Sequence, residues 1–197
     1  MALNHQYFFI YKPFGMLSQF SKEGDKPTLA DLDFKFSKDV YPVGRLDADS
    51  EGLLLLTNDT SVNKRLLHPR FKHSKTYLIQ VEGTINEAAI ERLREGVSIS
   101  IDGREHYTAP AKARIIEAPE LPERNPPIRF RKTVPDSWLE LIITEGKNRQ
   151  VRKMTAAVGF PTLRLVRWKI EDLTMEDPFP GKVVSLDKET VFKKLKL

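Results

Sequence analysis

Residues 44–59 of the chain read GRLDADSEGLLLLTND, a charged segment that runs directly into four leucines. The run Leu53–Leu56 is too short for a helix and predicts a β-strand that is buried on both faces. Three carboxylates, Asp47, Asp49 and Glu51, come just before it. Carboxylates beside buried apolar surface are costly unless they are solvated, order a turn, bind a metal or take part in chemistry. The stretch therefore predicts a central strand with a candidate functional site at its start.

Three interpretations of these carboxylates imply different chemistry. The letters DADSEG resemble the start of a calcium-binding loop, but the twelfth position is Asn58 where the site requires a bidentate glutamate, and no helix precedes it. A second interpretation is a polar turn in which Asp49 and Ser50 bond backbone amides. In the third, one carboxylate is a nucleophile or base beside a cationic partner. Spacing alone argues against calcium and leaves the other two open.

Outside this stretch, predicted strands outnumber helices. Apolar runs predict further strands at 5–12, 40–44, 75–83, 97–101, 111–117, 137–144 and 162–170. Helices are predicted from a cap at Asp59 or Thr60 through residue 68, from a cap at Asn86 to Gly96, and over 148–158. Four prolines in residues 118–127 predict a loop. This pattern predicts an α+β fold around a largely antiparallel, mixed sheet with flanking helices.

Length and composition narrow the class of protein. A chain of 197 residues can bury the core of one domain or of two closely packed lobes. The absence of cysteine excludes disulfides, cysteine–zinc sites and thiol nucleophiles. No stretch approaches the roughly 18–20 apolar residues of a membrane span, and the first residues lack the layout of a signal peptide. We therefore expect a cytoplasmic protein with no membrane association.

Positive charge is concentrated in two clusters. The chain has a net charge of +5, yet residues 145–169 alone contain seven basic side chains and one acid, a net charge of +6. The second cluster consists of Arg124, Arg129, Arg131 and Lys132. Aromatic residues are interleaved with both clusters, Phe130 in one and Trp168 in the other. Basic clusters of this kind favour a phosphate-rich partner over a merely solvated face.

Four ordered motifs resemble one enzyme family. The run GRLDADSEGLLLLTND resembles the signature of the RsuA-type bacterial rRNA pseudouridine synthases, and YKPFG at 11–15 resembles their opening strand. HPRFKHSKTYLIQVEG at 68–83 and EGKNRQVRKM at 145–154, followed by LRLVR, resemble two further blocks. The ending TLRLVRWKIEDLT and the lack of room for an N-terminal accessory RNA-binding domain make the chain most similar to the E-type, large-subunit branch. The resemblance implies one catalytic domain over 1–197, with two lobes and an active-site cleft between them.

The resemblance also implies roles for single residues. Asp47 is expected to be the catalytic aspartate, Arg152 its cationic partner, and Tyr77 the residue that stacks on the flipped base and receives the C5 proton. Attack at C1′, addition to C6 and removal of a C2′ proton all remain open for Asp47. Leu165 is expected below the base, and Arg45 is expected to expel the base or hold a phosphate. Further RNA contacts are expected from Lys147, Arg149, Lys153, Arg167, Arg129 and Arg131.

The implied reaction is the isomerisation of one uridine of large-subunit (23S) rRNA to pseudouridine. It adds nothing to the substrate, so no cofactor and no metal is expected, and we expect a monomer whose partner is this RNA. The motif departs from the family pattern at Ser50 and Thr60, where Thr and Gly are common, and at Glu171, where Gly is frequent. An inactive ribosome-associated RNA-binding protein would explain the charge, and a calcium-binding module the acids, but neither explains the four motifs together.

Overall fold

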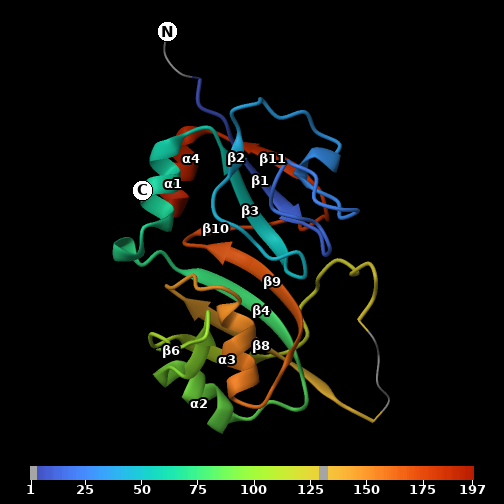
Figure 1. Cartoon of the computed structure of the whole chain (residues 1–197), viewed down its shortest axis with the longest axis vertical. Coiled ribbons are helices and arrows are strands. Elements are labelled where there is room, and N and C mark those ends of the chain that lie inside the picture. Colours follow the sequence, from blue (N-terminus) through green and yellow to red (C-terminus); the bar gives the residue numbers. More distant parts are fainter. Residues whose placement is uncertain (1–3, 129–132) are drawn as a thin grey trace. The chain divides into compact units, whose positions relative to one another are not determined.

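The computed structural model describes residues 4–128 and 133–197 (Figure 1). Arg129 and Arg131, which are expected to contact RNA, lie outside the described residues together with Phe130 and Lys132. The chain divides into two compact units, which we call unit 1 (Met1–His73 with Arg167–Leu197) and unit 2 (Ser74–Val166). The strand β9 (Thr162–Ile170) begins in unit 2 and ends in unit 1.

Unit 1 is built on the strand that the leucine run predicts. The strand β3 (Glu51–Thr57) is buried at every position, which confirms a strand enclosed on both faces. It pairs antiparallel with β1 (Tyr7–Lys12), and β1 pairs antiparallel with β11 (Val183–Leu186). The short strands β2 (Tyr41–Pro42) and β10 (Leu173–Thr174) add to β3 and to the end of β9. The helical segments of unit 1 are η1 (Leu29–Asp31), α1 (Thr60–Leu67), η2 (Pro69–Phe71) and α4 (Lys188–Leu195).

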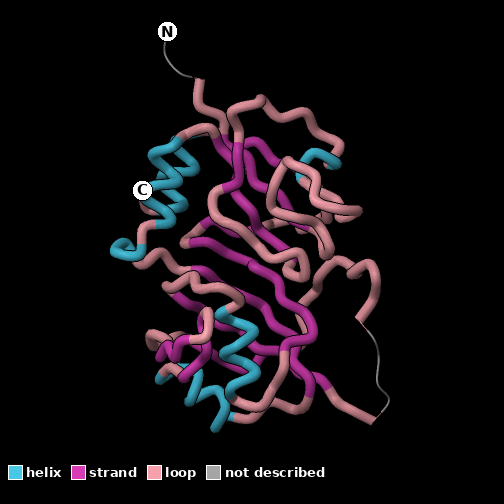
Figure 2. Tube along the Cα trace, in the orientation of Figure 1, coloured by secondary structure: helices cyan, strands magenta, loops and turns pink. Residues whose placement is uncertain are grey.

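The residues between β1 and β3 form an irregular excursion that covers one face of these strands. Phe8 and Ile10 from β1 and Leu54 and Leu56 from β3 share a buried cluster with residues of this excursion, including Leu46. The excursion carries the GRLDADS motif, so packing against β1 and β3 fixes where the motif lies. Figure 2 shows the excursion as a long loop interrupted only by short regular segments.

Unit 2 is built from antiparallel strands and has a core of its own. The strands β4 (Lys75–Glu82), β8 (Asp136–Ile143) and β7 (Lys112–Ile116) pair in that order, and β5 (Ser98–Ile101) forms a hairpin with β6 (Arg104–Tyr107). Two helices belong to this unit, α2 (Glu87–Glu95) and α3 (Gln150–Ala157). Their apolar faces join β4, β7 and β8 in one buried cluster.

The predicted helix ends agree with the structure because side chains cap them. Asp59 accepts a hydrogen bond from the backbone N–H of Ser61 at the start of α1 (2.9 Å). Asn86 does the same for Ala89 at the start of α2, and Gly96, at φ +104°, ends that helix. The predicted α+β class with a largely antiparallel sheet is confirmed.

The sequence prediction missed β6, β10, β11 and α4. The strand β6 reads REHY and is mostly exposed, so it lacks the apolar alternation that marks a strand. The signal that was available is Asp102–Gly103, whose positive φ values (+50° and +77°) form the turn between β5 and β6. In α4 only Val191 and Leu195 are buried, too little periodicity to predict a helix. Within residues 4–128 and 133–197, no helix is long and apolar enough to cross a membrane.

Candidate active site

The loop that carries Asp47 is held in place on both sides of this residue. The Ser18 hydroxyl accepts a hydrogen bond from the Leu46 N–H (3.0 Å) and donates one to the Leu46 carbonyl (2.8 Å). On the other side, the Ala48 carbonyl accepts a hydrogen bond from the Gly15 N–H (2.7 Å). Ser18 and Leu46 are both buried, whereas Asp47 itself is partly exposed. The carboxylate is thus presented from a fixed backbone, as a reacting group requires.

Lys12, which the sequence analysis did not single out, anchors the same loop. Its side chain is fully buried, and its ammonium group donates to the carbonyls of Met16 (2.7 Å), Pro13 (2.9 Å) and, at longer range, Ala48 (3.4 Å). Burial lowers the pKa of Lys12 to about 8, against the opposing effect of the nearby carboxylates of Glu51, Asp49 and Asp47. A lysine that ends an otherwise apolar strand just before Pro-Phe-Gly was the available signal. The YKPFG motif therefore supports the GRLDADS motif directly.

Glu51 and Ser50, which follow Asp47 in the motif, form hydrogen bonds within the protein. Glu51 is buried and accepts a hydrogen bond from the Tyr11 hydroxyl (3.2 Å). The Ser50 N–H closes a turn on the Asp47 carbonyl (3.0 Å). In the described part of the chain, residues 4–128 and 133–197, no three acidic or histidine side chains are grouped so as to hold a metal ion. Arg45, in contrast, is exposed.

Arg167 lies against the start of β3. Its side chain is only 5% exposed, and its Nε donates a hydrogen bond to the Leu53 carbonyl (2.8 Å). The neighbouring Gly52 has φ +105°, and its Cα approaches the Arg167 backbone closely. This geometry favours a role for Arg167 in holding β3 beside the end of β9 over a contact with RNA phosphates. The predicted RNA contact of Arg167 is untested.

Two residues expected near the base, Tyr77 and Leu165, come together in unit 2. Tyr77 on β4 and Leu165 on β9 are both buried and belong to the same apolar cluster (8% and 5% exposed). Val151, the neighbour of Arg152 on α3, belongs to this cluster as well. Arg152 itself is partly exposed. Their burial is equally consistent with Tyr77 and Leu165 being ordinary core residues. Because Asp47 belongs to unit 1, its pairing with Arg152 stays a prediction.

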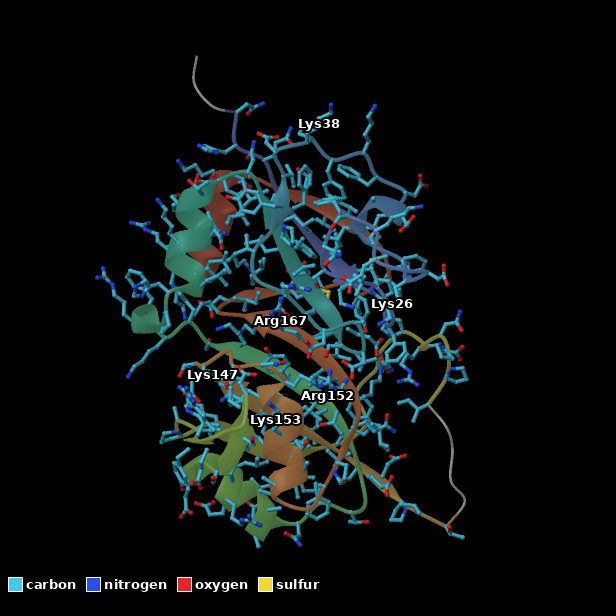
Figure 3. All side chains as sticks on the ribbon, viewed as in Figure 1. Lys26, Lys38, Lys147, Arg152, Lys153 and Arg167 are labelled. Carbon is cyan, nitrogen blue, oxygen red and sulfur yellow. The ribbon has the colours of Figure 1, made fainter. Side chains whose placement is uncertain are left out.

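The basic loop before α3 has a rigid polar frame. Gln150 is buried, and its amide accepts from the Lys147 N–H (3.0 Å) and donates to Glu145 (2.8 Å). Burial alone would raise the pKa of Glu145, but hydrogen bonds from the Ala109 N–H and the Gln150 amide outweigh it and lower the pKa. Figure 3 shows Lys147, Arg152 and Lys153 around the start of α3. The frame leaves Lys147 and Arg149 exposed, as phosphate contacts require.

Not every arginine of the basic clusters faces solvent. Arg164 is 8% exposed and donates to the Pro122 carbonyl (2.7 Å). Arg124 donates to the carbonyls of Pro126 (2.8 Å) and Pro127 (3.1 Å). Both guanidinium groups therefore bond backbone carbonyls of the proline-rich loop 118–127. Counting charges along the sequence does not separate such arginines from those that face a ligand.

Comparisons with known proteins agree with this fold and these motifs. A model of the RNA pseudouridylate synthase family matches residues 6–157, and the chain belongs to this family. It is therefore a pseudouridine synthase, an enzyme that converts uridine in RNA to pseudouridine. The recognition of the family, the fold class and the type of enzyme from the sequence are confirmed.

The similar proteins include E-type enzymes. The chain is 49% identical over 179 residues to ribosomal large subunit pseudouridine synthase E of Vibrio parahaemolyticus, covering 91% of this chain and 73% of that protein. It is 54% identical over 166 residues to the enzyme of the same name from Xanthomonas axonopodis, covering 84% of this chain and 85% of the relative. The solved structure of a pseudouridylate synthase matches with a TM-score of 0.77 and 30% identity, covering 98% of this chain and 74% of that one. Human RNA pseudouridylate synthase domain containing 1 shares the fold (TM-score 0.60, 14% identity, covering 97% and 91%).

Proposed function

We propose that the protein isomerises one specific uridine of large-subunit rRNA to pseudouridine, with Asp47 as the catalytic group. Relatives near 50% identity carry the name of large-subunit synthases, which supports this substrate. The observation that carries the proposal is the loop around Asp47. Its backbone is tied to Ser18 and Gly15 on either side, while the carboxylate stays partly exposed.

The reaction breaks the N1–C1′ bond, turns the base and joins C5 to C1′, while the C5 proton leaves and N1 regains a proton. Because atoms and electrons balance within the nucleotide, the proposal includes no cofactor and no metal. In this proposal Asp47 acts beside the sugar and the C6 edge of the base, and Arg152 is its cationic partner. Tyr77 stacks on the base and its hydroxyl receives the C5 proton, with Leu165 below the base.

RNA binding in this proposal comes from basic side chains, of which Arg45, Lys147 and Arg149 are exposed and Lys153 is partly exposed. Lys147, Arg149 and Lys153 contact the RNA backbone, and Arg45 helps to expel the base or holds a phosphate. Arg129 and Arg131 add contacts from outside the described residues. We further propose that residues 1–197 act as one catalytic domain of two lobes, as a monomer and in the cytoplasm.

The test is a matched pair of isosteric variants. Asp47→Asn is expected to abolish pseudouridine formation in transcripts of large-subunit rRNA while RNA affinity and Tm stay near wild type, because the amide cannot act as nucleophile or base. Asp49→Asn is expected to keep most of the activity, since in this proposal Asp49 only orders the turn. Pseudouridine mapping by chemical modification and primer extension measures both. Appreciable turnover by Asp47→Asn, or an equal loss in Asp49→Asn, would overturn the assignment.

A further inference from the structure

Unit 1 carries a third basic segment that the charge count along the sequence did not single out. Residues 60–73 of this unit contain four lysine and arginine residues and no acid. From Lys64 to Lys72, along the end of α1 and through η2, every side chain except Leu66 is exposed. Figure 2 shows η2 as a short helical turn directly after α1. The segment offers several cations to one ligand without a competing carboxylate of its own.

Phe71 gives this basic segment an exposed aromatic ring. Its side chain is 43% exposed, although phenylalanine in a soluble protein is usually buried. The guanidinium carbon of Arg70 lies 4.6 Å from the centre of the Phe71 ring, and the His68 ring meets it edge-on at 5.8 Å. Arg70 and Phe71 therefore form a stacked cation–aromatic pair at the surface.

The backbone presents this pair in a fixed conformation. The His68 ring accepts a hydrogen bond from the Arg70 N–H (3.3 Å). Lys72 adopts a left-handed conformation (φ +50°), and its N–H donates to the Pro69 carbonyl (3.3 Å). A turn closed at both ends loses little conformational freedom when it binds a ligand, which favours affinity.

The segment borders the loop of the catalytic aspartate within the same unit. A side-chain carbon of Leu67 lies 3.1 Å from the point that a Cβ on Gly44 would occupy. Gly44 directly precedes the exposed Arg45, two residues before Asp47. We therefore expect nucleotides that flank a uridine at Asp47 to reach this surface.

Other exposed aromatic rings of unit 1 lack these features. Phe179 is 65% exposed but follows Glu176 and Asp177, which repel phosphates. Phe34 is 40% exposed and packs against Phe8 and Phe36 in an aromatic cluster. Phe71 thus differs from them in combining an exposed ring, a stacked guanidinium and a stretch of sequence without acids.

We propose that residues 64–72, which we call the 64–72 platform, bind unpaired nucleotides of the substrate RNA beside the target uridine. Arg70 and Phe71 stack on one base, while Arg65 and Lys72 contact its neighbouring phosphates. Stacking on an aromatic side chain is sequence-tolerant and contributes about 1–3 kcal/mol per base. This assignment rests on the proposed function, since it takes the RNA substrate as the ligand.

The test measures RNA affinity by fluorescence anisotropy for the full chain and single-residue variants. The probes are a labelled hairpin from large-subunit rRNA with an open loop and a perfect RNA duplex of equal length. Phe71→Ala is expected to weaken hairpin binding by roughly 5- to 100-fold and to leave duplex binding unchanged, because duplex bases are not free to stack. Phe71→Tyr is expected to restore hairpin affinity.

The basic residues give a separate readout. The double variant Arg65→Ala, Lys72→Ala is expected to weaken both probes and to lower the slope of log affinity against log salt by about 0.7–0.9 per residue. Phe179→Ala is the matched control, an exposed phenylalanine of the same unit outside the platform, and is expected to bind like wild type. Tm values identify any variant that is lost through unfolding.

Several outcomes would overturn the proposal. Wild-type hairpin affinity in Phe71→Ala, or an equal loss in Phe179→Ala, would mean that Phe71 does not stack on RNA. Phe71-dependent sedimentation with phosphatidylserine vesicles and no effect on RNA would assign the platform to a lipid surface. If the wild type forms no pseudouridine but hairpin binding still depends on Phe71, the proposed function fails and the platform stands.

Discussion

Replacing Gly52 with alanine tests the close contact between β3 and the Arg167 backbone in unit 1. Gly52 is the second residue of β3 and has φ +105°, a conformation that residues with a side chain rarely adopt. A Cβ built at this position overlaps the carbonyl oxygen of Arg167 and lies 2.9 Å from its backbone nitrogen. Both neighbours are main-chain atoms, so no side chain can rotate away to make room.

The expected loss has two parts. The unfavourable φ costs about 1–3 kcal/mol. Overpacking against the Arg167 backbone adds another ~1–3 kcal/mol, since β3 and the end of β9 must separate to admit a methyl group. The sum, about 2–6 kcal/mol, is a large part of the roughly 5–15 kcal/mol that stabilises an ordinary domain.

Gly15→Ala is the matched control, because it isolates the first part. Gly15 also has a positive φ (+85°), but no atom lies within 4 Å of its Cβ position. Urea unfolding followed by tryptophan fluorescence gives the free energy of unfolding for both variants, provided that the m values agree. Gly52→Ala is expected to lose at least about 1–3 kcal/mol more than Gly15→Ala. Equal losses would refute the reasoning, because they would show that the Arg167 backbone leaves room for a side chain.

Two further predictions concern Lys12 and Tyr77. The pKa of Lys12 is lowered from 10.5 to about 8, so the folded protein binds fewer protons between these values. The contribution of Lys12 to stability therefore improves as the pH rises from 8 to 10.5, by about 3 kcal/mol. Urea unfolding gives the free energy of unfolding of wild type and of Lys12→Met, and their difference should move in favour of wild type as the pH rises through this window. A difference that does not change with pH would contradict the burial argument. Tyr77→Phe keeps the ring and removes the hydroxyl, so it should bind RNA normally and stall after the glycosidic bond is remade. If the Tyr77→Phe variant released tritium from C5 as fast as wild type, the proton role of the hydroxyl would be refuted. The Tyr77→Ala variant is less informative, because removing a buried ring also costs about 3–5 kcal/mol of stability.

The sequence alone was enough to predict those strands and helix ends that depend on residues only a few positions apart. Successive side chains of a strand point to opposite faces, so the four consecutive leucines of β3 make both of its faces apolar. Burial on both sides therefore follows from the sequence alone. Asp59 and Asn86 cap their helices through bonds to amides two or three residues away, which a sequence pattern can indicate. The ordered motifs identified the family in the same way, because they require only residue type and spacing.

The strands that were missed are stabilised by pairing with another strand, which in the case of β11 is distant in the sequence. The strand β11 lies nearly the length of the chain from its partner β1, and its register, Tyr7 opposite Leu186, is a property of the pairing. The exposed strand β6 is stabilised by the turn at Asp102–Gly103 and by β5, not by an apolar face of its own. Propensity and periodicity are weak where tertiary pairing supplies most of the stability.

Only the tertiary structure decided which basic residues face solvent and which bond carbonyls of the protein itself. The sequence places Arg149, Arg164 and Arg167 in one cluster of positive charge, but Arg149 is exposed, while the other two are buried. Arg167 donates to a carbonyl 114 positions away, and Arg164 to one 42 positions away. A guanidinium group can satisfy its donors on a phosphate or on a protein carbonyl, and composition is the same in both cases. Which of the two it meets depends on which distant backbone segments the fold brings beside it.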